Sequence, residues 1–314
     1  MSKTILITGV AGFIGSNLAV RLTQEKRFRV IGIDNLSYGL REQVPEGVEF
    51  HQLDIRSPSI YHLFEDVDTV YHLAAKNCIS DCQSNPIETA DINITGTINV
   101  LEACRRARVR KLIYAESSAL YEGIDRFPST EKETSPQSFY SLSKAAVIPF
   151  VEKYTELYGL ATTALRYFCV YGPRQDYRRT IPPVFSAFII KLLKKEQPVI
   201  YGTGEKRRDF IYVDDVNDFH LQCLDDDRTN GKVFNLGSGA NYSIKEIYQT
   251  IASLLNCPIQ PIYKSDLAGE AQITLADVSQ AKQLGWSPKT DLKTGLMASI
   301  RFIQSELQQG NISQ

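Results

Sequence analysis

KTILITGVAGFIGSNLAVRL, residues Lys3–Leu22, contains the pattern around which the rest of the chain is organised. Its first part, Thr4–Thr8, is a run of apolar and β-branched residues typical of a buried parallel strand. The run ends at Gly9, which begins a triplet of glycines spaced three residues apart, and an apolar residue then recurs every fourth position to Leu22. The stretch therefore predicts a strand, a tight glycine turn and a helix in direct succession.

The glycines of this turn, Gly9, Gly12 and Gly15, are suited to holding a phosphate group. Glycine permits positive φ and lets backbone N–H groups approach a diphosphate, which also lies at the positive end of the helix dipole. A tight loop that binds nothing is the alternative interpretation. The dinucleotide interpretation is favoured because the triplet follows a strand, opens a helix and has an acidic residue about 20 positions further on.

That acidic residue is Asp34, which ends the second apolar run, Arg29–Ile33. A carboxylate at this position accepts hydrogen bonds from the adenosine ribose hydroxyls and would repel a 2′-phosphate. The sequence therefore favours NAD over NADP as the cofactor.

Strand-like runs alternate with helical patterns along the first half of the chain. The runs are Thr4–Thr8, Arg29–Ile33, Val48–Gln52, Thr69–Leu73, Lys111–Ala115 and Thr162–Tyr167. This alternation predicts an α/β fold with a doubly wound parallel sheet of the Rossmann type, in which ligands bind at the carboxyl ends of the strands. The residues that follow each strand are therefore the candidates for binding and catalysis.

The composition changes beyond Tyr167, where prolines and aromatic residues become frequent. We expect residues 1–167 to form the dinucleotide-binding domain, and residues 168–208 and 237–314 to form a smaller lobe that binds the substrate. Phe210–Val213 and Val233–Leu236 are strand-like, which predicts that the chain returns to the main sheet at about residues 209–236.

Composition and charge exclude several other classes. A formal net charge of −1 gives no electrostatic reason to expect binding to nucleic acid or to an anionic membrane. No apolar run is as long as a membrane span and no signal peptide precedes the first strand, which predicts a cytoplasmic protein. The six cysteines include no CxxC pair and no histidine at zinc-ligand spacing, so we expect reduced thiols and no metal site.

Tyr140 and Lys144 form a Y-x-x-x-K pair, and a spacing of four places both side chains on one helix face. A free phenol is a poor base at neutral pH, but a nearby ammonium group stabilises the phenolate and lowers the phenol pKa. Tyr140 can then exchange a proton with a sugar hydroxyl. The pair by itself is also compatible with an amphipathic surface helix.

Several motifs resemble those of the extended short-chain dehydrogenase family. TGVAGFIG, at residues 8–15, resembles TGxxGFIG, and Glu116–Tyr121 resembles SS-x-x-VYG, with Tyr121 at the motif's Tyr and Ser117, four residues before it, at the position of the catalytic Ser/Thr. Asn93–Val100 resembles N-x-x-GT-x-N, and Arg166–Gln175 resembles RYFNVYGPRQ. The resemblance covers nearly the full length and includes the order and spacing of the glycine turn, the serine and the Y-x-x-x-K pair.

This resemblance implies catalysis by Ser117, Tyr140 and Lys144. It implies that NAD contacts Gly9, Gly12, Phe13, Ile14, Gly15, Asp34, Asn35, Asp54, Ile55, Leu73, Ala74, Ala75, Tyr140, Lys144 and Tyr167. It assigns the nucleotide-sugar substrate to Ser117, Ser118, Cys169, Arg174, Tyr201, Arg208 and Glu270. Arg208 would pair with the substrate diphosphate, because a guanidinium fork matches phosphate oxygens.

The reaction class follows from the residues after Ser117. In 4,6-dehydratases of the family an Asp-Glu pair supplies the acid and base for eliminating water, and decarboxylases keep the Glu, whereas this chain has Ser118 and Ala119. We therefore expect NAD-dependent 4-epimerisation of a UDP-sugar through a transient 4-keto intermediate. The alternatives are a nucleotide-sugar 4,6-dehydratase, decarboxylase or 4-ketoreductase, or a non-catalytic NAD-binding regulatory protein.

Three positions depart from the family pattern. Cys169 replaces the usual Asn, Leu267 replaces a second diphosphate-binding Arg, and Pro149 lies inside the predicted catalytic helix, which it should bend. Such departures are expected for an unusual sugar nucleotide or for a loss of activity. In the family, the helices corresponding to about Ser84–Ala107 and Ser138–Leu157 pair across a dimer, so a homodimer is expected.

Overall fold

The computed structural model describes residues 3–179, 182–266 and 271–312. The chain forms two compact units. Unit 1 comprises Met1–Asp125, Thr130–Tyr167 and Asn217–Asn235, and unit 2 comprises Arg126–Ser129, Phe168–Val216 and Leu236–Gln314. Helix α7 (Val213–Asp225) and strand β10 (Lys232–Leu236) each contain residues of both units.

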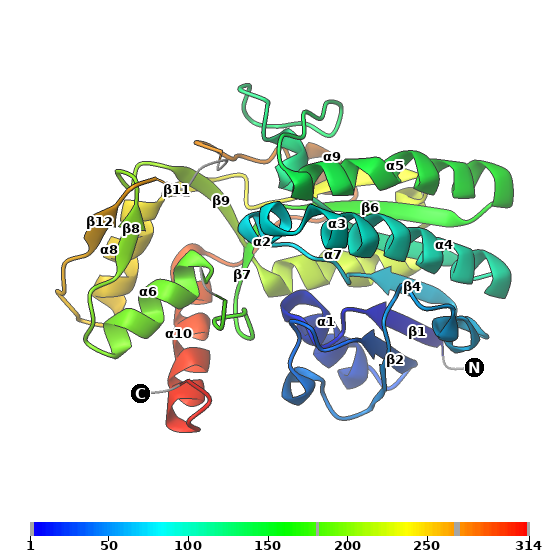
Figure 1. Ribbon diagram of the computed structural model, residues 1–314, viewed down its shortest axis with the longest axis horizontal. Helices are drawn as coiled ribbons and strands as arrows, with labels where there is room; N and C mark the ends of the chain where they lie inside the picture. Colours follow the sequence, from blue (N-terminus) through cyan, green and yellow to red (C-terminus); the bar gives the residue numbers. More distant parts are fainter. Residues whose placement is uncertain (1–2, 180–181, 267–270, 313–314) are drawn as a thin grey trace. The chain divides into compact units, whose positions relative to one another are not determined.

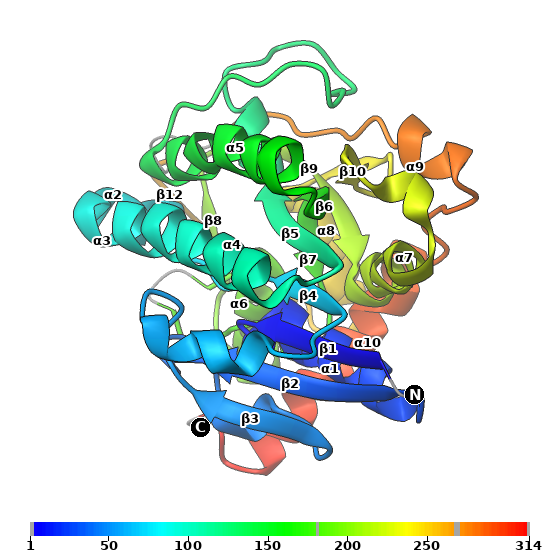
Figure 2. The same ribbon diagram turned by 90° about the vertical axis from the view of Figure 1, so that its right-hand side faces the viewer.

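Unit 1 is built on a sheet with the strand order β10-β6-β5-β4-β1-β2-β3 (Figure 1, Figure 2). The remaining strands of this sheet are β1 (Lys3–Thr8), β2 (Phe28–Asp34), β3 (Val48–Gln52), β4 (Thr69–His72), β5 (Lys111–Ser117) and β6 (Ala161–Tyr167). Parallel pairs join β3 to β2, β2 to β1, β1 to β4, β4 to β5 and β5 to β6. The predicted doubly wound sheet is confirmed, because the chain winds from β1 outward to β3 and then reverses direction at β4.

Helices cover both faces of this sheet. Figure 2 shows α4 and α5 on one face, and α1 and α7 on the other. The helices of this unit, besides α7, are α1 (Phe13–Gln24), α2 (Ile79–Ser84), α3 (Pro86–Ala90), α4 (Gly96–Ala107) and α5 (Phe139–Tyr158). A π-helical turn, Asp91–Thr95, connects α3 to α4, and Pro149 lies inside α5, which continues without a break to Tyr158.

The sequence explains why the strands of unit 1 are buried. In β1 every residue after Lys3 is buried, as expected for an apolar run covered by helices on both sides. Leu6, Val70 and Leu112, from neighbouring strands, belong to one hydrophobic cluster that also receives Val100 from α4. The core therefore lies between the sheet and its helices, and the polar ends of the strands lie at its edges.

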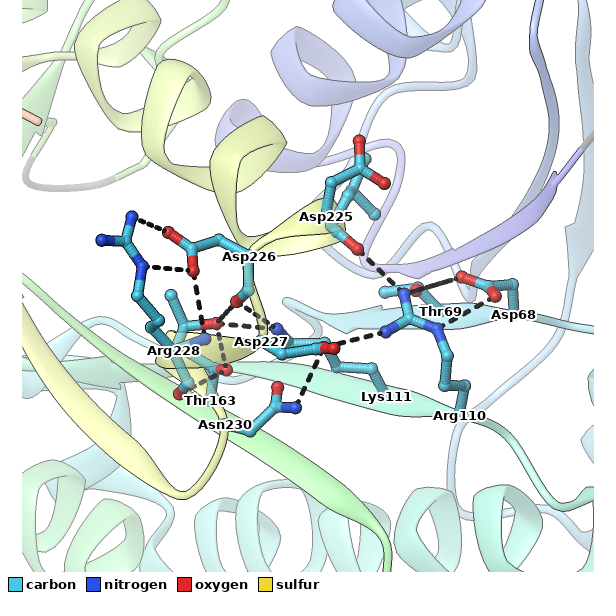
Figure 3. A network of polar contacts seen from close by, with 12 residues as sticks. Asp68, Thr69, Arg110, Lys111, Thr163, Asp225, Asp226, Asp227, Arg228 and Asn230 are labelled. Atoms are coloured by element: carbon cyan, nitrogen blue, oxygen red, sulfur yellow. Dashed lines mark hydrogen bonds and ion pairs between the residues drawn. The ribbon is translucent and has the colours of Figure 1, made fainter. Parts of the chain in front are cut away.

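The amino-terminal ends of β4 and β5 carry a polar network (Figure 3). Arg110, just before β5, forms an ion pair with Asp68 at an Nη2–Oδ2 distance of 3.0 Å. The next residue, Lys111, is fully buried, and its Nζ donates to Thr229 Oγ1 at 2.7 Å and to the Asp226 carbonyl at 3.3 Å. We call this group the amino-end network; it consists of Asp68, Thr69, Arg110, Lys111, Thr163 and residues 224–230.

Unit 2 contains a small sheet of order β11-β9-β7 and a two-stranded sheet, β12-β8. Its strands are β7 (Cys169–Tyr171), β8 (Val199–Tyr201), β9 (Arg207–Tyr212), β11 (Asn241–Ser243) and β12 (Ile262–Lys264), and its helices are α6 (Val184–Leu193), α8 (Ile244–Leu254), α9 (Ser279–Gln283) and α10 (Leu292–Gln308). The prediction that Phe210–Val213 joins the main sheet is wrong, because β9 pairs with β7 and β11. A strand-like pattern predicts burial but does not specify the partner strand. Val233–Leu236, in contrast, lies in β10 of the main sheet, as predicted.

The core of unit 2 is rich in aromatic residues. The ring of Phe185 lies 4.6 Å, between centroids, from the ring of Tyr171 and equally far from that of Phe210. Gly295 of α10 packs directly on this cluster, since a Cβ there would be 2.3 Å from the Tyr171 hydroxyl oxygen. A larger residue at this helical position would require the aromatic cluster to move.

Two further observations concern the chain as a whole. Among the described residues, no helix has both the length and the apolar character that crossing a membrane requires. The six cysteines are free, and Cys82, Cys104, Cys223 and Cys257 are buried. Burial raises the pKa of the Cys104 thiol well above its usual range, which makes this thiol chemically inert.

Candidate active site

The glycine turn joins the carboxyl end of β1 to the first turn of α1. Gly9 has a φ of +74°, and a Cβ there would be 2.7 Å from the backbone nitrogen of Ala74. A Cβ on Gly15 would be 2.2 Å from the carbonyl oxygen of Gly9. Both positions therefore exclude side chains, and the backbone of the turn and the N-terminus of α1 are held close together, as a diphosphate cradle requires. Phe13 and Ile14 lie in the first turn of α1 and are half-buried.

Asp34, at the end of β2, ties the glycine turn to the loop that follows β2. Its Oδ2 accepts from the backbone N–H of Ala11 at 3.0 Å, and its Oδ1 accepts from that of Leu36 at 2.8 Å. Burial raises the pKa of Asp34, and these two hydrogen bonds oppose that shift. Each carboxylate oxygen keeps a second lone pair, so Asp34 can still accept from ribose hydroxyls.

A second acidic group adjoins the end of β2. Asn35 Nδ2 donates to Asp54 Oδ2 at 2.9 Å, and Arg56 Nη2 donates to the same oxygen at 2.8 Å. The Arg56 guanidinium holds the pKa of Asp54 well below its usual range. Ile55 is buried and packs on Gly96 of α4, where a Cβ would be 2.6 Å from its Cδ1. The structure thus brings Asn35, Asp54 and Ile55 together at the ends of β2 and β3.

Leu73, Ala74 and Ala75 follow β4, beside the glycine turn. The backbone N–H of Ala74 donates to Thr8 Oγ1 at 3.3 Å. His72, which precedes them, lies between Thr8 Oγ1 at 2.8 Å and Thr97 Oγ1 at 2.9 Å. Burial lowers the pKa of His72 to about 3, so this imidazole is neutral and links β1, β4 and α4.

Ser117 ends β5 and begins the 3₁₀ turn Ser118–Tyr121. Its Oγ accepts from the backbone N–H of Ala119 at 3.1 Å, which fixes the side chain as the cap of this turn. In the sheet, Ser117 is in register with Tyr167 of β6. The hydroxyl of Tyr167, a predicted cofactor residue, is buried and bonds His220 Nε2 at 2.7 Å.

Tyr140 and Lys144 lie one turn apart near the start of α5, as predicted. Lys144 is buried, and its Nζ donates to the carbonyl of Ala115 in β5 at 2.9 Å. Burial lowers the pKa of Lys144 to about 8, and the nearby Glu116 carboxylate opposes this shift. Ser117 lies two residues beyond Ala115, so the side chain of Lys144 reaches the part of β5 that carries the serine. All three predicted catalytic residues belong to unit 1.

Sequence reasoning assigned no role to Asn93, although the motif N-x-x-GT-x-N begins there. Asn93 lies on the π-helical turn before α4. Its Oδ1 accepts from the Lys76 N–H at 2.8 Å, and its Nδ2 donates to the Lys76 carbonyl and to Ser143 Oγ, each at 2.9 Å. Ser143 Oγ in turn donates to the Tyr140 carbonyl at 2.7 Å. Asn93 therefore connects the chain after β4 to the helix that carries Tyr140 and Lys144.

Glu116 and Arg166 form a buried ion pair that sequence reasoning also missed. Arg166 Nε donates to Glu116 Oε2 at 2.6 Å, and the two side chains are 5% and 1% exposed. The Tyr114 hydroxyl donates to Glu116 Oε1 at 2.7 Å, and Arg166 Nη1 donates to the Tyr121 hydroxyl oxygen at 2.9 Å. No local sequence pattern predicts such a pair, because the partners come from β5 and β6 and are distant in sequence.

Three of the predicted substrate residues, Cys169, Tyr201 and Arg208, lie on different strands of unit 2, and Arg174 follows β7. Cys169 of β7 is in register with Phe210 of β9, and Tyr201 ends β8. Arg174 has a φ of +67°, and burial lowers the pKa of its guanidinium. Arg208 of β9 directs Nη1 to the carbonyl of its neighbour Arg207 at 3.1 Å. Glu270 and Leu267 lie outside the described residues.

Asp209, next to Arg208, is the centre of a polar network in unit 2 that we had not predicted. Its carboxylate is fully buried and accepts from the N–H and Oγ of Ser238, at 2.6 and 2.7 Å, and from the N–H of Gly239 at 3.1 Å. The N–H of Ala276 also donates to it, at 3.0 Å. Asp209 thereby fixes the backbone of Ser238 and Gly239, just after β10.

Comparison with known proteins identifies the family of this chain. Residues 5–237 match the NAD dependent epimerase/dehydratase family. A putative UDP-glucose 4-epimerase of Methanocaldococcus jannaschii is 35% identical, over 96% of this chain and 98% of that protein. The crystal structure of UDP-glucose 4-epimerase with UDP-glucose from Thermotoga maritima is 31% identical, with a TM-score of 0.93 over 97% of this chain and 99% of that one.

A third similar protein was solved with both ligands. The UDP-glucuronic acid 4-epimerase of Bacillus cereus, in complex with UDP-glucuronic acid and NAD, is 29% identical. Its TM-score is 0.90 over 96% of this chain and 99% of that one. These three proteins are all named as 4-epimerases, and they differ in the sugar named.

Proposed function

The chain belongs to the NAD dependent epimerase/dehydratase family, and we propose that it is an NAD-dependent isomerase that inverts C4 of a UDP-sugar. The observation that carries this proposal is the joint placement of Ser117, Tyr140 and Lys144 in the unit that also holds the glycine turn and Asp34. Acid–base residues and a dinucleotide cradle on one parallel sheet are what hydride chemistry on a sugar alcohol requires.

The residues of unit 1 fit NAD. Any side chain at Gly9 or Gly15 would collide with backbone atoms, so the absence of side chains lets a diphosphate approach the backbone of the turn and the N-terminus of α1. Asp34 is available to the adenosine ribose and would repel a 2′-phosphate. When bound, the nicotinamide supplies the hydride acceptor and donor for C4 of the sugar.

We assign the proton transfer to Tyr140. Its phenolate takes the proton of the sugar 4-hydroxyl as hydride leaves C4, and Ser117 Oγ holds the same oxygen by a hydrogen bond. The ammonium of Lys144, one turn away and anchored on the Ala115 carbonyl, stabilises the phenolate. A 4-keto sugar results. Return of hydride to its opposite face, with the proton returned by Tyr140, inverts C4 without net oxidation.

The surroundings of Ser117 favour this outcome over elimination or decarboxylation. Ser118 and Ala119 follow it, so neither carries the carboxylate that those reactions use. The neighbouring Glu116 is not a substitute, because its two oxygens are bonded to Arg166 and Tyr114 and its side chain is 1% exposed. The 4-keto sugar therefore meets no carboxylate on this turn that would divert it to another product.

We assign substrate recognition to unit 2. Its guanidinium groups at Arg174 and Arg208 suit the diphosphate of a nucleotide sugar, and Cys169, Tyr201 and Glu270 are the further candidates. Unit 1 would then hold the cofactor together with Ser117 and Ser118. Substitution of Arg208 by Leu tests this assignment, since it should raise the KM for the UDP-sugar while the affinity for NAD is unchanged.

We also propose that two copies of the chain pair through α5. Phe139, Leu142, Phe150 and Leu157 lie along one stripe of this helix and are 50%, 48%, 45% and 64% exposed. Ile87 of the neighbouring α3 is 83% exposed. Sedimentation of Phe150→Glu tests the pairing, because a charge on this stripe should leave a monomer.

We place the protein in the cytoplasm. Its six cysteines are free thiols, which is typical of proteins in a reducing compartment. Cell fractionation followed by immunoblotting tests this location, and recovery of the protein in the secreted fraction would contradict it.

The decisive experiment is to incubate the purified protein with UDP-glucose, UDP-N-acetylglucosamine and UDP-glucuronate, with and without added NAD, and to follow products by proton NMR. A galacto-configured product is expected from at least one of them. The matched control is Tyr140→Phe, which should bind NAD normally and lose turnover. If all three sugars return unchanged from a protein that binds NAD, inversion of these UDP-sugars is contradicted, and sugars on other nucleotides and a non-catalytic NAD-binding role become the alternatives to test.

A further inference from the structure

Glu122 connects the turn that carries Ser117 to the helix that carries Tyr140. It directly follows the 3₁₀ turn Ser118–Tyr121, and its backbone N–H donates to Ala119 at 3.2 Å. The family motif SS-x-x-VYG has glycine at this position, so the fold itself does not require a carboxylate there. The side chain of Glu122 is therefore a particular feature of this chain.

The carboxylate of Glu122 is bonded to the start of α5. Its Oε2 accepts from the N–H groups of Gln137 and Ser138, at 3.1 and 2.8 Å, and from Ser141 Oγ at 2.7 Å. Its Oε1 accepts from Ser138 Oγ at 3.0 Å. The charge lies at the positive end of the helix dipole, which strengthens these bonds. The bonds hold Ser138, two residues before Tyr140, and Ser141, the residue directly after it.

The helix does not depend on Glu122 for its cap. Ser138 and Ser141 already form a reciprocal capping box, with Ser141 N–H donating to Ser138 Oγ at 3.1 Å. Backbone bonds from Ser135 to Leu120 and from Gly123 to Ser135 hold the chain three residues before the cap. What Glu122 adds is a direct side-chain connection between the Ser117 turn and the first turn of α5.

We propose that Glu122 is a positioning residue that sets the placement of Tyr140 relative to Ser117. This inference rests on the proposed function, in which both side chains bond the same sugar oxygen. A hydrogen-bonded relay depends on heavy-atom separations held within a few tenths of an ångström, and a shift of about 1 Å costs about a hundredfold in rate. The carboxylate is long enough to span the two segments, and its four acceptor bonds leave it little freedom.

The test compares Glu122→Gln with Asp291→Asn. Asp291 is a matched control because it caps α10, accepting from Thr294 N–H at 2.9 Å and Thr294 Oγ1 at 2.6 Å, and because unit 2, to which it belongs, contains none of the proposed catalytic residues. Both variants lose one negative charge at a helix N-terminus with little change in size. A difference in kcat between the two variants therefore reflects the residues on the two helices, because α5 contains Tyr140 and Lys144 and α10 contains no proposed catalytic residue.

Steady-state kinetics on the NAD-loaded enzyme give the first measurement. Glu122→Gln should lower kcat by about tenfold to a hundredfold, with KM and the Kd for NAD changed by less than about twofold, because only alignment at the reacting oxygen is lost. Asp291→Asn should leave all three constants unchanged. Equal kcat values for Glu122→Gln and the unmodified enzyme would overturn the proposal.

Hydrogen–deuterium exchange gives a second measurement that does not need turnover. Glu122→Gln should speed exchange both in residues 137–142 and in residues 117–123, since the two segments are held together. Faster exchange in residues 137–142 alone would identify a simple cap and overturn the proposal. If the unmodified enzyme proves inactive, the proposed function fails, and the exchange experiment still decides whether Glu122 couples the two segments.

Discussion

Two buried lysines lie at opposite ends of strand β5. Lys111 begins the strand and donates to Thr229 Oγ1 and to the Asp226 carbonyl. Lys144 comes from α5 and donates to the Ala115 carbonyl near the other end of the strand. Burial lowers the pKa of both side chains. By exposure, residue type and direction of pKa shift, the two are nearly alike.

Their surroundings differ. Lys111 lies in the amino-end network, where a hydroxyl and a carbonyl oxygen accept its hydrogen bonds. The adjacent Arg110 forms an ion pair with Asp68 in the same network (Figure 3). Lys144 shares a helix face with Tyr140 and lies within the field of the Glu116 carboxylate. A buried lysine is therefore not by itself a functional signal. The group beside it decides whether its charge serves chemistry or packing.

The largest effect is expected from Lys144→Met. Removing the ammonium takes away the charge that stabilises the Tyr140 phenolate, so kcat should fall by about 10²- to 10⁴-fold. The NMR assay of sugar inversion measures it. Turnover within threefold of the unmodified enzyme would break the comparison, because Lys144 would then be a structural lysine like Lys111.

The next effect concerns the ion pair beside Lys144. Arg166→Met leaves the Glu116 carboxylate buried without its partner, which should lower the free energy of unfolding by about 3–5 kcal/mol. Urea denaturation followed by circular dichroism measures it. The double variant Glu116→Met with Arg166→Met is the control, and it should regain most of the loss since no buried charge remains. Equal stability of the single and double variants would argue against this account.

The pH dependence of stability sharpens the comparison further. The pKa of Lys144 is about 8 in the folded chain, against 10.5 for the side chain in water, so between these values only the unfolded chain binds the proton. The free energy of unfolding should therefore rise with pH across this window, by up to about 3 kcal/mol. The difference between the urea curves of the unmodified protein and Lys144→Met isolates this term. A difference that does not vary from pH 8 to 10.5 would contradict the shift.

The smallest effect is expected from Lys111→Met. The loss of two hydrogen bonds is offset by removal of a buried charge, so the free energy of unfolding should change by less than about 2 kcal/mol. Turnover should be unchanged, because the amino-end network has no contact with the residues proposed for catalysis among those that the structure describes. A tenfold loss of kcat would show that the two ends of β5 are coupled.

Much of unit 1 could be predicted from the sequence. The glycine triplet, the apolar runs that became β1 to β6, and the one-turn spacing of Tyr140 and Lys144 are local patterns, and the structure contains each of them. Phe210–Val213 shows where such reasoning fails. Its first three residues do lie in a strand, but they pair with β7 of unit 2 instead of joining the main sheet.

The sequence by itself determined the elements of the fold, the cradle for a dinucleotide and the residue types available for acid–base chemistry. These depend on interactions between residues a few positions apart, which a linear pattern records. Tertiary structure alone decided that Glu116 is neutralised by Arg166 and that Glu122 reaches the helix of Tyr140. It also decided that Lys111 bonds Thr229 at one end of β5, whereas Lys144 bonds the Ala115 carbonyl at the end that carries Ser117. Burial and hydrogen-bond partners arise from contacts between distant segments, and no local pattern specifies them.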